Sequence, residues 1–217
     1  MDLIKWPFLK QSWGMEVVRS EGPYLYTKEG QKILDAAGGA IVSNIGYGRE
    51  EVAEAVKQAT KNNSYVLPPF LTPERESLLD ELREHWLPPH LTRIHLSSGG
   101  SEANESAVKL AIQYQASRGK PEKNIILTRT LSYHGTTLNM SGISGHAARK
   151  RGLESYVPKA PMIETPYPLR CPLGSFHPDA KDYYLDNLKE VIKKIGSENI
   201  AGLLMEPVNG SSGGAIS

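Results

Sequence analysis

The chain has a single cysteine, Cys171, among its 217 residues, so it cannot contain an internal disulfide and offers no cysteine cluster for a metal. Its net charge is also small: 25 basic and 24 acidic residues leave +1, which gives no electrostatic reason to expect nucleic acid or an anionic membrane as a partner. No apolar run approaches membrane-spanning length, and residues 1–10 lack the apolar core and cleavage site of a secretory signal. We therefore expect a cytoplasmic protein that binds neither nucleic acid nor membranes and holds no metal.

The organisation of the chain changes near residue 50. Residues 1–50 are punctuated by glycines between short β-prone pieces, which is typical of an N-terminal arm or part of a small domain. Residues 51–217 carry longer helical and strand patterns, and we expect them to form the N-terminal portion of a large domain.

An alternation of strands and helices dominates the second part. Helical patterns cover 49–59 and 74–86, the latter after the start signal Thr72-Pro73. The runs 124–127 and 200–205 are typical of strands buried on both faces. The pattern predicts an α/β fold with a mainly parallel sheet and helices on both of its faces. The predicted elements are strands at 93–97, 124–128, near 162 and at 200–206, and helices at 101–117, from about 135, and at 179–195.

A turn of small residues lies between the first of these strands and its helix. Gly99 and Gly100 allow close approach to a ligand, Ser101 is a candidate helix cap and hydroxyl donor, and the free N–H groups of the first helical turn favour an anion such as phosphate. The alternative is an ordinary capped helix, and the turn alone does not discriminate between the two.

Two further polar groupings follow predicted strands, at 133–135 and 206–208. Ligands bind parallel sheets at the carboxyl ends of strands, so we expect these groupings and the turn at 98–101 to line one crevice.

Taken in order, the segments 98–105, 132–136 and 205–208 resemble the motifs of the class III aminotransferases, the pyridoxal-phosphate-dependent group that includes ornithine and ω-amino-acid transaminases. The segments 30–39 and 44–48 are similar to that family's N-terminal part. The resemblance implies a fold-type I architecture with pyridoxal 5'-phosphate as cofactor. It also implies a homodimer with active sites at the interface, and a small-molecule amino donor and a 2-oxo acid as substrates.

The resemblance also assigns roles to individual residues. Gly100 and Ser101 match the phosphate-binding pair, and Tyr133 matches the aromatic residue that lies against the cofactor ring. His134 accompanies Tyr133, and Gly135 permits the sharp turn and close approach. Outside the motif, Tyr133 and His134 would more simply be core residues.

Glu206 matches a family glutamate near the cofactor ring, which in some members pairs with a mobile arginine. A carboxylate at the end of a buried strand needs a partner, which favours a site role. Glu102 and Asn104 are better interpreted as support for the first helical turn.

The sequence gives weaker signals for the residues that bind the substrate. By their place in the family pattern, Ile41 and Phe70, in the loop 67–72, are candidate substrate-binding residues, and Trp13 is a weaker one. Each is equally compatible with core or interface packing.

Pyridoxal chemistry needs a Schiff-base lysine and an acid at the ring nitrogen, and neither is found in this sequence. We interpret Lys109 and Lys123 as surface charges. The family's acid and lysine are expected beyond Ser217, so we expect the natural polypeptide to continue and the 217-residue chain alone to be inactive. The alternatives are a truncated, non-catalytic homologue that acts as a binding or dimerisation module, and an aminomutase or decarboxylase-like enzyme of the same fold.

Overall fold

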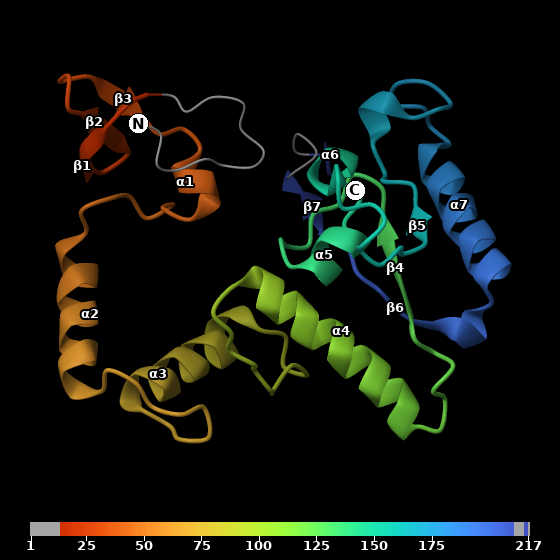
Figure 1. Ribbon diagram of the computed structural model, residues 1–217, viewed down its shortest axis with the longest axis horizontal. Coiled ribbons are helices and arrows are strands. Elements are labelled where there is room, and N and C mark those ends of the chain that lie inside the picture. The colour runs from red at the N-terminus through yellow and green to blue at the C-terminus, as the bar shows by residue number, and fades with distance from the viewer. Residues whose placement is uncertain (1–13, 211–214, 217) are drawn as a thin grey trace. The chain divides into compact units, whose positions relative to one another are not determined.

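The computed structural model describes residues 14–210 and 215–216, and it divides into two compact units between Ile94 and His95 (Figure 1). The assignment of 1–50 to an arm and of 51–217 to a large domain stays a prediction.

The first unit combines a small antiparallel sheet with helices. The strands β1 (Val17–Glu21), β2 (Tyr24–Thr27) and β3 (Lys32–Leu34) pair in the order β1-β2-β3. Asp35 ties the two glycine-rich segments together, because it accepts hydrogen bonds from the N–H of Gly39 at 2.7 Å and from the hydroxyl of Tyr47 at 2.7 Å. The helical elements are α1 (Gly38–Ile41), α2 (Glu50–Asn62), α3 (Pro73–Glu81) and the π-helical turn Leu82–Trp86.

Both helices expected in this unit are present. Thr72 caps α3 by accepting a hydrogen bond from Arg75 N at 3.3 Å, and Pro73 opens the helix as the start signal predicts.

The second unit contains a parallel sheet of three strands in the order β5-β4-β6, built from β4 (Ile125–Arg129), β5 (Met162–Ile163) and β6 (Ile200–Leu203). Thr128 pairs with Met162 on one side of β4, and Leu127 pairs with Leu203 on the other. The helix α4 (Gly100–Ser117) packs on β6 and α7 (Ala180–Ile195) packs on β5, which gives the α/β arrangement that the alternation predicts (Figure 1). The remaining elements are α5 (Leu138–Ile143), α6 (Ala147–Lys150), the 3₁₀ turns Pro168–Arg170 and Ser197–Asn199, and the antiparallel pair β7 (Val208–Asn209) and β8 (Ala215–Ile216).

One strand prediction is wrong and another is only partly confirmed. No strand forms at 93–97, because these residues find no ladder partner in the described part of the chain. The strand at 200–206 is shorter than expected, and Leu203 is 40% exposed. Burial on both faces needs a packing layer against each face, and the described residues do not cover Leu203.

The core of this unit gathers around β4. Leu127, Met140, Ile143 and Ile163 are buried, and the strand continues into the fully buried polar residues Thr128 and Arg129. Buried polar groups need hydrogen-bond partners, and the partners of these two residues form the candidate site. No helix of the described residues is both long and apolar enough to cross a bilayer.

Candidate functional site

The turn after β4 is held by a chain of buried hydroxyls. Leu131 adopts a left-handed conformation, with φ of 62°, and Ser132 then donates its hydroxyl to Arg129 O at 2.7 Å. Thr128 Oγ1 lies 3.1 Å from Ser132 Oγ and 2.8 Å from His134 Nε2. The order His134 Nε2–H to Thr128, Thr128 to Ser132 and Ser132 to the carbonyl gives every group a partner.

The imidazole of His134 is therefore buried and bonded to Thr128. Its side chain lies among buried groups, and this burial lowers the pKa of the imidazole below 6.5; the nearby Glu206 carboxylate opposes this shift, and Arg129 adds to it. The neutral ring acts as one link of the hydroxyl chain.

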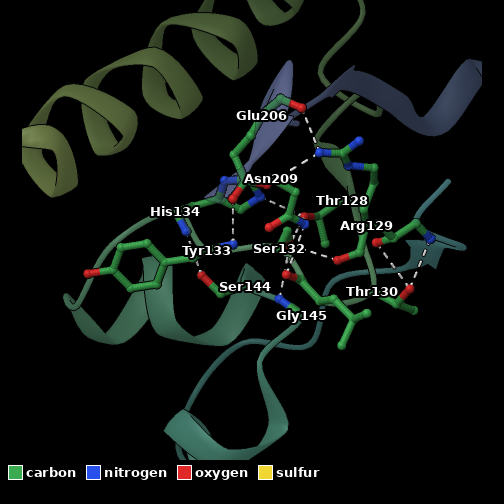
Figure 2. Close-up of polar contacts among 12 residues, drawn as sticks. Thr128, Arg129, Thr130, Ser132, Tyr133, His134, Ser144, Gly145, Glu206 and Asn209 are labelled. Carbon is green, nitrogen blue, oxygen red and sulfur yellow. Dashed lines mark hydrogen bonds and ion pairs between the residues drawn. The ribbon is translucent and has the colours of Figure 1, made fainter. Parts of the chain in front are cut away.

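A buried ion pair connects β4 to the segment after β6. The side chain of Arg129 is 1% exposed, and its Nη2 lies 3.5 Å from Glu206 Oε2 and donates to Glu206 O at 2.6 Å. The second carboxylate oxygen of Glu206 accepts from Tyr133 N at 3.0 Å. Glu206 thus fixes the backbone of Tyr133, while the Tyr133 ring projects away from the hydroxyl cluster (Figure 2).

The N-terminus of α4 offers donors for an anion. The first helical hydrogen bond joins Ala103 N to Gly99 O, and within the described residues the N–H groups of Gly100, Ser101 and Glu102 have no acceptor. A side chain at Gly99 or Gly100 would meet no atom of the described residues within 4 Å, so this part of the chain leaves open space beside the turn.

The prediction that Ser101 caps this helix is wrong. Gly99 occupies the cap position and no side chain caps it, while Glu102 accepts from Ser98 N at 3.0 Å. Ser101 lies one residue inside the helix, and its Oγ accepts from Thr136 N at 3.0 Å. That contact uses an oxygen lone pair and leaves the hydroxyl proton available to a ligand.

The loop 133–136, to which Thr136 belongs, is held close to α4 by two further contacts. An ideal Cβ at Gly135, where φ is 147°, would lie 2.5 Å from Ser101 Oγ, so only glycine fits. Asn104 Nδ2 donates to His134 O at 2.7 Å, which makes Asn104 a link between α4 and the loop rather than a support for the first turn alone. These contacts join the turn at 98–101 to the segment 133–135, and the hydrogen bond from Tyr133 N to Glu206 joins that segment to 206–208. The structure thus brings together the three polar groupings expected at the carboxyl ends of the strands.

One turn further along α4, Glu105 secures the start of α5. Its carboxylate accepts from Thr137 Oγ1 at 2.6 Å and from Asn139 Nδ2 at 2.8 Å. Burial acts to raise the pKa of Glu105, but these hydrogen bonds and the charge of Lys109 outweigh it and lower the pKa.

Two residues of this arrangement could not be predicted from the sequence. Arg129 reads as the end of a strand, and Ser144 belongs to no recognisable motif, yet Ser144 Oγ accepts from His134 N at 2.9 Å. Their contacts depend on sequence separations of 10 to 77 residues, which no local pattern reveals.

The candidate substrate residues lie in the other unit. Ile41 is 73% exposed and has a left-handed φ of 67°, and Phe70 is 61% exposed in a loop that Arg75 holds by donating to Phe70 O at 2.8 Å. Their role stays a prediction, and Trp13 lies outside the described residues.

These features define an α/β protein with a candidate site whose groups suit a phosphate-bearing planar ligand. Free helix N–H groups and a hydroxyl suit the phosphate, and the projecting Tyr133 ring suits a flat ring. The family model for class III aminotransferases matches residues 10–217, and the chain belongs to this family, whose solved members share the fold-type I architecture.

Known proteins resemble the chain over nearly its whole length. An uncharacterized aminotransferase of Bacillus subtilis, YodT, is 34% identical over 200 residues, which are 91% of this chain and 44% of that protein. Putrescine–pyruvate aminotransferase of Pseudomonas aeruginosa is 29% identical over 91% of the chain and 43% of its own length.

Solved structures agree. An amine transaminase from an uncultivated Pseudomonas species, solved with bound pyridoxal phosphate, has a TM-score of 0.90 and 26% identity over 99% of this chain and 50% of its own. An (S)-enantioselective ω-transaminase from Thermomicrobium roseum has a TM-score of 0.86 and 31% identity over 99% of this chain and 48% of its own. The chain thus spans about half the length of the relatives that it matches.

Proposed function

We propose that this chain carries the phosphate-binding and ring-binding half of a pyridoxal-phosphate-dependent transaminase, which moves an amino group from an amine or ω-amino acid to a 2-oxo acid. The observation that carries the proposal is the meeting of the α4 N-terminus with the loop that presents Tyr133. Family membership and the names of the relatives support it.

The phosphate would lie at the first turn of α4. The N–H groups of Gly100, Ser101 and Glu102 and the Ser101 hydroxyl are oriented donors, and the helix dipole adds partial positive charge. Hydrogen bonds to charged groups contribute about 1.5 to 3 kcal/mol each. The loop that carries Tyr133 already lies against these donors, because Gly135 and Thr136 contact Ser101.

The ring would lie against Tyr133. Its backbone is fixed by Glu206, which in turn is fixed by Arg129, so the ring is presented from a rigid base. When bound, pyridoxal phosphate supplies an electron sink for the carbon that carries the transferred nitrogen. The chemistry also needs a Schiff-base lysine and an acid at the ring nitrogen, and we assign neither role to a residue of this sequence.

The ion pair with Arg129 indicates what Glu206 does in the site. Both carboxylate oxygens have partners within this chain, and Arg129 is buried on a strand. We therefore propose that Glu206 acts as a fixed support of the ring-binding loop. The homodimer, the cytoplasmic location and the candidate substrate residues Ile41 and Phe70 belong to the same proposal.

The test uses the full-length natural polypeptide. An ¹⁵N-labelled amine or ω-amino acid is incubated with an unlabelled 2-oxo acid and pyridoxal phosphate, and the products are separated by mass. Label in the amino acid formed from the 2-oxo acid supports a transaminase, whereas label returned to the donor's own carbon skeleton indicates a mutase. Bound cofactor without any transfer would favour the non-catalytic binding module.

A further inference from the structure

Arg149, a residue outside all the motifs, lies over the ring of Tyr133. Its guanidinium carbon is 4.6 Å from the ring centroid, which is within the range of a cation–π contact. Arg149 belongs to α6, and the spacing of 16 residues from Tyr133 offers no local signal for the contact.

The position of Arg149 follows from how its segment is attached. Gly145 N donates to Ser132 O at 2.9 Å and to Ser132 Oγ at 3.0 Å. A Cβ at Gly145 would overlap Arg129 O and Leu131 N, so the segment lies directly against the turn after β4.

The second attachment is on the other side of Tyr133. Ser144 Oγ accepts from His134 N at 2.9 Å, so the residues before and after Tyr133 are both bonded to 144–145. Arg149 follows Gly145 by four residues, and its side chain extends back to the ring of Tyr133, which lies between the two bonded residues.

We propose that Arg149 is a positioning residue that holds the Tyr133 ring from one face and leaves the other face for the cofactor ring. An aromatic side chain with a fixed backbone still rotates about its side-chain bonds, and ordering it on binding costs free energy. A guanidinium stacked on one face removes part of that cost in advance. This inference rests on the proposed function.

The experiment measures the dissociation constants of pyridoxamine phosphate and of pyridoxamine for the full-length, cofactor-free protein. These probes carry an amine in place of the aldehyde and bind without a covalent bond. Arg149→Met should weaken both by about two- to fivefold, because the contact concerns the ring and not the phosphate. Arg149→Lys keeps the charge and should recover part of the affinity.

A matched control and a double variant separate this role from others. Arg118 lies 5.6 Å from the ring of Tyr114 at the far end of α4, and Arg118→Met should leave both constants unchanged. In a Tyr133→Leu background, Arg149→Met should have no further effect, whereas a merely structural loss would persist.

The outcomes are distinct. Unchanged constants in Arg149→Met overturn the inference, and so does a loss that persists without Tyr133 or that appears only with the phosphorylated probe, since Arg149 would then bind the ligand itself. If the wild-type protein binds neither probe, the proposed function fails; if it binds both and Arg149→Met matches it, only the inference fails.

Discussion

Gly135 and Ser101 lie so close that no side chain fits between them: an ideal Cβ on Gly135 would be 2.5 Å from Ser101 Oγ and 2.9 Å from Ser101 Cα. The first turn of α4 and the loop that carries Tyr133 therefore share one contact surface. A change at this point moves the phosphate-binding and ring-binding parts of the site relative to each other.

We expect Gly135→Ala to weaken binding of pyridoxamine phosphate by about fivefold or more, because overpacking at a close backbone contact costs about 1 to 3 kcal/mol and displaces the donors. The measurement is a titration of the full-length protein, with Gly152→Ala as control, since a Cβ at Gly152 meets nothing within 4 Å while its φ of 83° is also left-handed. Equal effects of the two changes would show that backbone strain, and not the contact with Ser101, is responsible.

Ser101→Ala removes one oriented hydroxyl and should reduce affinity for pyridoxamine phosphate by about 1 to 3 kcal/mol, while affinity for pyridoxamine changes little. The same change removes the acceptor for Thr136 N, so the comparison of the two ligands is essential. An equal loss for both ligands would assign Ser101 to the loop contact alone.

Much of this arrangement can be predicted from the sequence, because several of its signals are local. The alternation of periodic segments places β4, α4 and α7, and the small residues at 98–101 indicate the helix N-terminus that carries the donors. The need for glycine at 135 is likewise visible in the motif, although its contact partner is not.

What could not be predicted depends on partners far apart in the chain. Arg129 looks like any strand residue until Glu206, 77 residues later, is placed beside it. The strand expected at 93–97 fails for a related reason, since a β-prone run becomes a strand only when another strand pairs with it. Ser101 reads as a cap because local sequence does not show that Thr136 needs its oxygen.

The charges of Arg129 and Glu206 should contribute more to the free energy of unfolding than the packing of their side chains does. Glu206→Gln keeps an acceptor for Tyr133 N but removes the carboxylate charge that faces the buried Arg129 guanidinium, and we expect a loss of up to about 3 kcal/mol in the free energy of unfolding. Combining it with Arg129→Met should restore part of the loss, since the guanidinium that the Glu206 carboxylate faced is then removed as well. Chemical unfolding of the three variants provides the comparison, and a double variant less stable than Glu206→Gln would contradict the argument.

Burial of His134 makes the stability of this unit depend on pH. Its pKa in the folded protein lies below the ordinary value of 6.5, so between these two values the unfolded chain binds a proton that the folded chain does not. The stability is therefore fully present above about pH 7.5 and falls as the pH drops through 6.5 toward the lower folded value.

His134→Gln places an amide N–H near the position of Nε2, where it can still donate to Thr128 Oγ1. The variant has no group that titrates there, so its urea midpoint should fall less than that of the wild type between pH 7.5 and 5.5. Because the other histidines are the same in both proteins, the difference between the two curves isolates His134. Parallel curves would mean that the imidazole is protonated as readily in the folded as in the unfolded chain. They would contradict the conclusion that a neutral His134 belongs to the buried hydroxyl chain.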